Sequence, residues 1–416
     1  MTSGLDRPPA TVRFNPFTAE FRSDPYPAYR ALREAAPVHR ALGMWVLTRH
    51  ADVRAVLHDR SFAADLIPRL VAERAGAAAD PGMARVARLA QGSLVFTEGP
   101  AHARLRGLVN RVFTRAAVAG LRDAVAARVR DLAGRLPAAG EGVVDVVAEF
   151  AAPLPVAVLT DWMALPAELA GRVPDWTHDV RFLLEPGLVQ PAGIARVAGV
   201  VAEFTAALEA VVEERRAHPG DDLVSRLLAA RAGSGDRFTA EEIAFLCIMC
   251  FVAGTETTTA LIGSAVLALL HHPREPERLR TAPAHASAVV AETLRHQTPL
   301  QLTKRVATRP HRVGDQEIRP GDQVLLCLGA ANRDPAVFPR PDEFDSSRDT
   351  TAHLAFGHGV HGCLGAGLAT LQATVALEEL ARRGFGWRPA PGDGVVWQDD
   401  SVILRGPERL PVVAAG

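Results

Sequence analysis

The sequence predicts a mainly α-helical fold with small β-sheets. Apolar residues recur at helical spacing from about residue 100 to residue 294, whereas strand-like patterns are limited to short stretches. Proline and glycine are scattered along the chain without a break in composition. We therefore expect one domain over residues 1–416, with a β-richer N-terminal part to about residue 95 and a helical remainder.

The composition excludes several classes of protein. The 416 residues carry 46 basic and 47 acidic side chains, so a net charge of −1 offers no field that would gather nucleic acid. Four cysteines are too few for a disulfide framework, which indicates a reducing compartment. No run of about 18 uncharged apolar residues marks a membrane anchor, so we expect a soluble, cytoplasmic protein.

Local patterns place the elements in order. A short helix is expected over Tyr26–Ala35 and an extended segment over Met44–Leu47. Strand-like residues run from Gln301 to Leu328, with turns at residues 313–315 and 320–322. A loop rich in Pro, Asp and Arg, a glycine-rich loop, a further helix and short strands complete the chain.

One long helix is expected in the middle of the chain. Thr239 caps its start, with Glu242 three residues on, and His272-Pro273 stops it after about His271. At 1.5 Å per residue, about 33 residues span roughly 50 Å, which is enough to cross a domain. Because the helix is apolar on nearly all sides, we expect it to be buried.

The strongest motif surrounds one cysteine. Four glycines lie among the ten residues from Phe356 to Gly365, and Cys363 opens a predicted helix over Leu364–Arg382. Backbone N–H groups at a helix start favour a thiolate and lower the pKa of a cysteine from about 8.5, and glycines let a flat ligand approach the backbone. The pattern suits a metal with one protein ligand, such as haem iron. The alternative is a glycine-rich turn with an incidental cysteine.

Two further patterns mimic cofactor sites. Gly357, Gly359 and Gly362 spell G-x-G-x-x-G, but the dinucleotide fingerprint needs more parallel sheet after it, and only about 50 residues remain. Cys247 and Cys250 have a redox or zinc spacing, but they lie inside the buried helix without a second ligand pair. We interpret these cysteines as small apolar residues and regard a dinucleotide-binding oxidoreductase as the weaker hypothesis.

The middle of the long helix carries residues that a buried helix rarely uses. Gly254, Thr255, Thr257 and Thr258 are poor helix formers, and a threonine hydroxyl can bond the carbonyl four residues before it. Glu256 beside Thr257 offers an acid and a hydroxyl that can relay protons. The alternative is a threonine-rich kink whose glutamate is simply paired.

Two charged pairs lie about one helical turn apart. Glu292 and Arg295 share a helix face, which is typical of a surface ion pair. His102 and Arg106 share another face, which suits a carboxylate or phosphate, or else forms a solvated basic surface.

These motifs, in this order, resemble the cytochrome P-450 family of haem-thiolate monooxygenases in its soluble bacterial form, over nearly the whole chain. The resemblance implies the P-450 fold with the long central helix over the haem, haem b as cofactor and dioxygen as co-substrate. It implies Cys363 as the iron ligand and Glu256 and Thr257 as the catalytic acid–alcohol pair. Departures from the family pattern, at Thr370 and Gln372, lie beyond the cysteine.

The resemblance also assigns residues around the cofactor. Glu292 and Arg295 would form an internal ion pair, and its third partner is one of Asn332, Arg333 and Arg348. The propionates would be held by His102, Arg106, Arg305 and His361, and further haem contacts would come from Ala253, Phe356, Gly357 and Gly365.

The resemblance implies electron donors outside the chain, because 416 residues leave no room for a reductase domain. We expect a ferredoxin and a ferredoxin reductase, with the acidic face of the ferredoxin meeting Arg106, Arg111 and Arg115. We also expect a monomer with a small-molecule substrate and no nucleic-acid partner.

Segments that usually cover the family's pocket are mostly apolar here, so we expect a largely apolar, fairly bulky substrate. Candidate pocket residues are Leu66, Ile67, Leu94, Val95, Phe182, Met249, Cys250, Leu300, Leu302 and Val402. The Arg-, Ala- and Gly-rich composition is typical of a GC-rich bacterial genome, which favours a tailoring step in natural-product biosynthesis. Hydroxylation is the default outcome; epoxidation, oxidative coupling and nitration stay open.

A non-catalytic haem sensor or a recruiting scaffold is the competing class. Such relatives would be expected to lose the thiolate or the acid–alcohol pair, whereas Cys363, Glu256 and Thr257 are all present.

Overall fold

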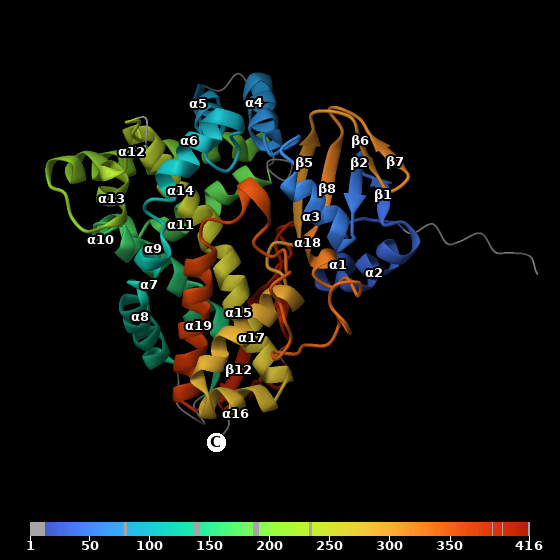
Figure 1. The fold of residues 1–416 in the computed structure, drawn as a ribbon. Helices are drawn as coiled ribbons and strands as arrows, with labels where there is room; N and C mark the ends of the chain where they lie inside the picture. Colours follow the sequence, from blue (N-terminus) through green and yellow to red (C-terminus); the bar gives the residue numbers. More distant parts are fainter. Residues whose placement is uncertain are drawn as a thin grey trace, which may run out of the picture.

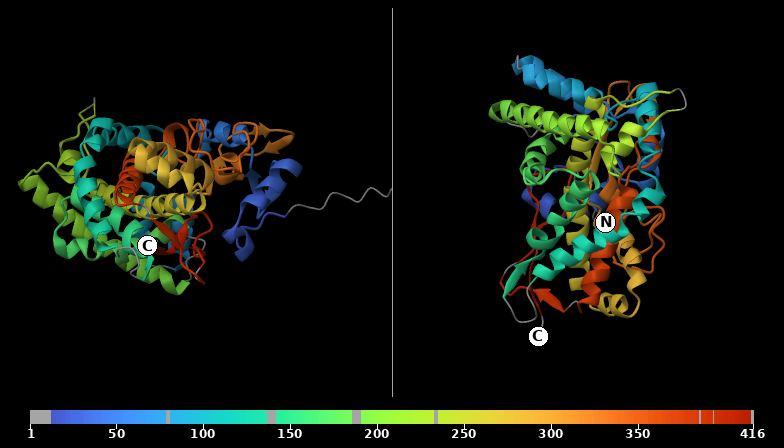
Figure 2. Two further views of the ribbon diagram at one scale, coloured as in Figure 1. Left: turned by 90° about the horizontal axis from the view of Figure 1, so that it is seen from below. Right: turned by 90° about the vertical axis from the view of Figure 1, so that its left-hand side faces the viewer.

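The protein consists of a larger helical part and a smaller sheet-rich part that lie side by side (Figure 1). The structure is a computed structural model that describes residues 13–78, 81–136, 142–185, 191–232, 235–384, 386–392 and 394–414. Seen from below, the N-terminal helices and the neighbouring strands are set to one side of the helical part (Figure 2). The predicted mainly α fold with small β-sheets is confirmed.

The helices follow the chain in three groups. The first group is α1 (Ala19–Ser23), α2 (Tyr26–Ala35), α3 (His50–His58), α4 (Leu66–Ala78), α5 (Pro81–Gln91), α6 (Gly99–Val109), α7 (Arg115–Ala119) and α8 (Arg122–Arg135). The second is the π-helix η1 (Val147–Ala151), α9 (Pro153–Trp162), α10 (Ala167–Ala170), α11 (Val173–Val180), the 3-10 helix η2 (Arg181–Leu184), α12 (Pro191–Ala217), α13 (Leu223–Ala229), α14 (Ala240–Gly254) and α15 (Glu256–His271). The third is α16 (Arg274–Thr281), η4 (Pro283–His285), α17 (Ala286–His296), α18 (Leu328–Ala331), η5 (Gly359–His361) and α19 (Ala366–Arg382).

The main sheet combines strands from residues 38–63 with strands from residues 302–327. Its order is β1-β2-β8-β5-β3, and β2 pairs with β8 in parallel while the other neighbours are antiparallel. These strands are β1 (Val38–Ala41), β2 (Met44–Leu47), β3 (Phe62–Ala63), β5 (Leu302–Ala307) and β8 (Gln323–Cys327). The sequence therefore located β2 at its observed bounds, together with the strand-rich stretch that holds β5 and β8.

Three smaller sheets complete the fold. The hairpin β6 (His311–Val313) and β7 (Gln316–Ile318) projects from the main sheet region in Figure 1. The short strands near the C-terminus form the other two sheets. In one, β12 (Pro411–Ala414) pairs with β9 (Trp387–Pro389) and with β4 (Val143–Asp145) from earlier in the chain. In the other, β10 (Val396–Trp397) pairs with β11 (Pro407–Arg409).

The core is built around α14 and α15. Ile243, Ile248, Phe251, Leu261 and Ile262 are almost completely buried in the largest apolar cluster, which also takes in α8, α9, α12, α17 and α19. This is why the middle of the chain is apolar on all sides rather than on one face. The same segment, Ala240–His271, is the one helix among the described ranges that is long and apolar enough to span a membrane, and it lies inside the protein.

The predicted long central helix is present over Ala240–His271, with an irregularity at one residue in its middle. The capping box at Thr239 and Glu242 is present, and the irregularity lies at Thr255, between α14 and α15. The Thr255 hydroxyl donates to the Phe251 carbonyl at 2.8 Å, and the Thr257 hydroxyl donates to the Ala253 carbonyl at 2.7 Å. Such side-chain bonds compete with the backbone hydrogen bonds of a helix and bend it.

Glu292 and Arg295 of α17 form a fully buried ion pair, so the surface interpretation is wrong and the internal one holds. The two carboxylate oxygens lie 2.6 and 2.8 Å from Nη2 and Nε of Arg295, and both side chains are 0% exposed. Of the three candidate partners, Arg348 completes the charge cluster, with Nε 3.5 Å from Glu292 Oε1. Arg333 instead donates to the His296 carbonyl.

The Glu292→Ala variant should lower the free energy of unfolding by about 3–5 kcal/mol, because it leaves the Arg295 charge buried and unpaired. Denaturant titration followed by circular dichroism measures this loss. Glu277→Ala is the matched control, since the Glu277–Arg280 pair has the same i, i+3 spacing but is 62% exposed on both sides. That control should change the free energy of unfolding little, because water screens an exposed pair, and equal losses in both variants would contradict the account.

Candidate active site

The glycine-rich loop holds Cys363 by backbone contacts. The Cys363 N–H donates to the Phe356 carbonyl at 2.8 Å, and the Gly357 N–H donates to the Leu354 carbonyl at 2.9 Å. Gly359 has a φ of +75°, and a Cβ there would lie 2.5 Å from the Leu57 carbonyl oxygen of α3. Because no other residue fits that conformation and that approach, this glycine sets how the loop packs against α3.

Burial raises the pKa of the Cys363 thiol. The residue keeps accessible surface, but the protein around it removes part of the water that would stabilise a thiolate, and this raises the pKa. The N–H groups of Gly365 and Ala366 and the Arg106 guanidinium lower the pKa by less. The predicted lowering by the backbone N–H groups at the helix start is therefore present, but burial outweighs it. A thiolate at this position needs a further positive charge, and a ligated metal ion supplies one.

Cationic and donor groups from three elements meet beside the cysteine loop. His102 and Arg106 lie on α6, and Arg106 Nη1 donates to the Gly362 carbonyl at 2.9 Å. The His102 and His361 ring centroids are 4.4 Å apart. Arg305 of β5 joins them, since its charge acts on Glu98, whose carboxylate lies 3.1 Å from His361 Nε2. The structure thus brings together the four residues predicted to hold the haem propionates.

Glu98 is a member of this cluster that the sequence analysis missed. Burial raises its pKa, but hydrogen bonds from His361 and the Ala64 N–H, with the charges of His361 and Arg305, hold the pKa below its usual value. Its place one helical turn before His102 at the start of α6 was the available signal.

His102 contributes a potential hydrogen-bond donor to this cluster. Burial, followed by the charge of His361, lowers the pKa of His102 to about 4, so its ring is neutral near pH 7. Its Nε2 is buried and has no hydrogen-bond partner within the described part of the chain. A buried polar atom of this kind needs a partner, and an anionic group such as a haem propionate supplies it.

The opposite wall is formed by the C-terminal half of α14. Ala253 is exposed although Phe251 and Val252 beside it are buried, and Cys250 on the same helical face is half-buried. Burial raises the pKa of Cys250 to about 12. An accessible cysteine on a glycine-rich loop, with cationic groups beside that loop, fits a flat, dianionic haem.

The acid of the central helix is both paired and incompletely satisfied. Glu256 Oε1 accepts from Arg181 Nη1 at 3.0 Å, while Glu256 Oε2 is buried without a hydrogen-bond partner among the described residues. Burial raises the pKa of Glu256, and Arg181 only partly offsets this. Arg181 also donates to Asp400. The sequence offered no motif that pointed to Arg181 or Asp400.

The candidate pocket residues fall into two groups by exposure. Val95 is 40% exposed, and Cys250, Leu300 and Val402 are half-buried. The buried members are Leu66, Leu94, Met249 and Leu302. The side chains of Ile67 and Phe182 lie outside the described residues.

Leu302 does not belong to the pocket. It packs with Phe21, Tyr26 and Leu325 in the cluster that joins the N-terminal helices to the main sheet. Side chains of a strand alternate between its two faces, and Leu302 occupies the face of β5 that is turned toward α1 and α2. The assignment of Leu302 to the pocket is therefore corrected, because the register of β5 places its side chain in this cluster.

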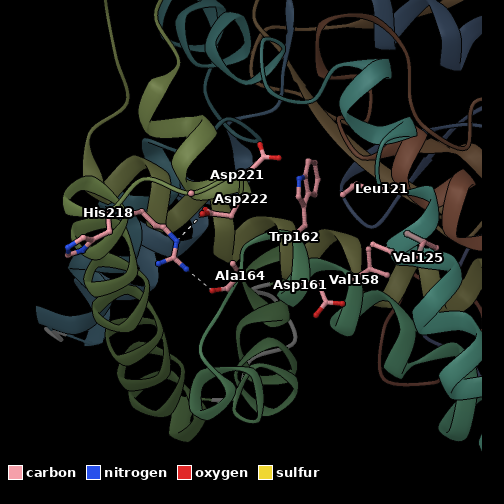
Figure 3. Close-up of a pocket in the computed structure, with 12 residues that line it drawn as sticks. Leu121, Val125, Val158, Asp161, Trp162, Ala164, His218, Asp221 and Asp222 are labelled. Atoms are coloured by element: carbon pink, nitrogen blue, oxygen red, sulfur yellow. Dashed lines mark hydrogen bonds and ion pairs between the residues drawn. The ribbon is translucent and has the colours of Figure 1, made fainter.

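A surface cavity of about 420 Å³ lies elsewhere, between α8, α9 and the C-terminal end of α12 (Figure 3). It is lined by Leu121, Val125, Val158 and Trp162 on one side and by His218, Asp221 and Asp222 on the other, and Arg215 also lines it. Asp161, Asp221 and Asp222 each pair with an arginine. Because these acids are already satisfied and no predicted site residue lines it, the cavity is not assigned as the active site.

The cysteine pair of the central helix behaves as predicted. Cys247 is 1% exposed in the core, and burial raises its pKa well above the usual value. No group of three or more His, Cys, Asp or Glu side chains among the described residues is arranged to hold a metal ion.

Comparison with known proteins agrees with this geometry. The family model described as cytochrome P-450 matches residues 187–283 and 284–412. Cytochrome P-450 107B1 of Saccharopolyspora erythraea is 37% identical over 412 residues, covering 95% of this chain and 96% of that protein. The 6-deoxyerythronolide B hydroxylase of the same organism is 34% identical, covering 94% and 96%.

Solved structures give the same result. The crystal structure of CalO2 superposes with a TM-score of 0.87 at 34% identity, covering 97% of this chain and 99% of that one. Both the fold and the sequence are matched over nearly their full lengths. The chain therefore belongs to the cytochrome P-450 family of haem monooxygenases, with haem b as its cofactor and dioxygen as its co-substrate.

Proposed function

We propose that this monooxygenase hydroxylates a largely apolar, fairly bulky natural product, with Cys363 as the iron ligand and with Thr257 and Glu256 delivering protons. The observation that carries the proposal is the accessible Cys363 on its glycine-rich loop, with the donors His102, Arg106 and His361 gathered beside it. When bound, the haem supplies oxygen activation, which consumes two electrons and two protons. The remaining steps are the work of side chains.

The haem would be held at one edge and at one face. His102, Arg106, Arg305 and His361 provide donors for its two propionates, and Glu98 orients His361 through the 3.1 Å contact. Arg106 also ties α6 to the cysteine loop through the Gly362 carbonyl. A group that orients a ligand residue in this way tunes the site without touching the metal.

Thr257 and Glu256 would form the proton route. The Thr257 hydroxyl donates to the Ala253 carbonyl at 2.7 Å, and its oxygen could accept a hydrogen bond from a proton donor, so it could pass a proton on without a change of charge. Glu256 supplies that proton, because its burial and its free Oε2 favour the protonated form.

The proposed substrate class is supported by the residues predicted to line the pocket. Val95, Cys250, Leu300 and Val402 are accessible and carry no charge, so burial of apolar surface would provide the binding energy. The similar protein from Saccharopolyspora erythraea is named as a hydroxylase of 6-deoxyerythronolide B. By analogy we infer a tailoring hydroxylation in secondary metabolism.

Electrons would arrive from a ferredoxin and its reductase. Arg111 and Arg115 are exposed near the end of α6 and are available to an acidic partner. Arg106 was expected on this surface but does not belong to it, because it is partly buried and donates to the Gly362 carbonyl. We further propose that the protein is a cytoplasmic monomer.

Macrolactone-sized apolar molecules should shift the haem absorption toward the high-spin form, because they displace water from the apolar walls of the pocket. Optical titration with a panel of macrolactones measures this, and short polar acids and alcohols serve as controls. A shift with the polar set alone would contradict the proposed substrate class.

Replacement of Thr257 should uncouple electron use from product formation. Thr257→Ala should lower product formed per electron pair by about 10-fold or more and release peroxide, since it removes a group that transfers protons. The measurement compares NADH consumed, product and peroxide in the holoenzyme with a surrogate ferredoxin and reductase.

Thr255→Ala is the matched control for that experiment. Its hydroxyl makes the same bond to the carbonyl four residues before it but is buried. It should leave coupling unchanged. Unchanged coupling in Thr257→Ala would show that protons travel another way.

A further inference from the structure

A single buried arginine connects the central helix with the loop near the C-terminus. The Arg181 side chain, at the start of η2, is 9% exposed. Its Nη1 lies 3.0 Å from Glu256 Oε1, and its Nη2 donates to Asp400 Oδ2. One guanidinium therefore serves two carboxylates that come from segments far apart in the sequence.

The loop that carries Asp400 is held in place by a second charged residue. Glu185, four residues after Arg181, accepts hydrogen bonds from the Ser401 hydroxyl and from the Val402 N–H, the latter at 3.0 Å. Asp400 is thus presented to Arg181 by an anchored loop, and Gln398 donates to it as well. These hydrogen bonds fix the position of the loop, and therefore the contact between Asp400 and Arg181.

Charged groups from three neighbouring segments act on Glu256. The positive charges of Arg181 of η2 and His178 of α11 favour its ionised form and lower its pKa, whereas the negative charge of Asp400 raises its pKa. Two carboxylates share one guanidinium, so the cluster keeps a net negative charge when both are ionised. Protonation of one carboxylate relieves that repulsion.

The unequal exposure of the two carboxylates decides which one takes the proton. The Asp400 side chain is 46% exposed, whereas that of Glu256 is 22% exposed. Water stabilises the charge of the more exposed group, so Asp400 stays ionised and Glu256 is the group that is protonated. The directions of their pKa shifts agree, because that of Asp400 is lowered and that of Glu256 is raised.

We propose that Asp400 is a positioning residue that competes for Arg181 and thereby keeps Glu256 Oε2 protonated and ready to donate toward Thr257. This inference rests on the proposed role of Glu256 as the acid of the proton route. It adds a residue from the loop near the C-terminus that acts on Glu256 through Arg181.

The Asp400→Asn variant tests the inference. Without the second carboxylate, Arg181 acts on Glu256 alone, so the ionised form of Glu256 is favoured and its pKa falls. Because Glu256 must be protonated to donate, product formed per electron pair should decline at a pH lower by about one unit than in the wild type. The pH dependence of coupling in the reconstituted holoenzyme measures this shift.

Two control variants isolate the charge of Asp400. Asp399→Asn removes the neighbouring exposed carboxylate, which has no ion pair within the described residues, and should leave the pH profile unchanged. Asp400→Glu keeps the charge and should restore the wild-type profile. An Asp400→Asn profile identical to that of Asp399→Asn would overturn the inference.

A spectroscopic titration keeps the test independent of turnover. The infrared band of the protonated Glu256 carboxyl, assigned by its absence in Glu256→Gln, should titrate about one pH unit lower in Asp400→Asn. An unshifted band would also refute the role of Asp400. If Glu256→Gln instead leaves coupling intact, the proposed proton route fails, and that outcome is distinct from a failure of the inference about Asp400.

Discussion

The buried pair of Glu292 and Arg295 is the interaction on which the placement of the cysteine depends. Arg295 donates to the carbonyls of Asn332, Pro341 and Glu343, which fixes the long loop before the cysteine motif. Asn332 Oδ1 in turn accepts from the Leu354 N–H at 2.6 Å, and the Leu354 carbonyl accepts from Gly357. A charge pair that is costly to bury thus positions the loop that carries Cys363.

The electrostatics of the site have one theme, which is that buried groups are protonated or uncharged until a partner arrives. Burial raises the pKa of Cys363 and of Glu256 and lowers that of His102. The proposed partner of the Cys363 thiol is a metal ion, and that of the His102 imidazole is an anionic group. The Glu256 carboxyl would act as a proton donor. The shifts of Glu256 and His102 have the sign that their proposed roles require, whereas that of Cys363 opposes the thiolate form until a metal ion is bound.

The sequence predicted those features that depend on local pattern. The spacing of His102 and Arg106, the glycines around Cys363 and the apolar run of the central helix all survive in the structure, because each is set by residues close together in the chain. The kink at Thr255 was foreseeable in kind, since threonines in mid-helix bond backwards.

The features that escaped prediction depend on contacts between distant segments. The burial of Glu292 and Arg295 could not be told from their spacing, which a surface pair shares, and was expected only from the family resemblance. Arg181 and Asp400 belong to no motif and meet only when η2 and the loop near the C-terminus fold together. Leu302 was misplaced because the face of β5 it occupies is set by pairing with β8, which local alternation does not reveal.

The central claim is that Cys363 binds haem iron as a thiolate, and the carbon-monoxide difference spectrum of the dithionite-reduced, purified holoprotein tests it most directly. The account predicts a strongly red-shifted Soret band. A Soret band at the position typical of histidine ligation would contradict the thiolate assignment, and well-folded protein that takes up no haem would contradict the site as a whole.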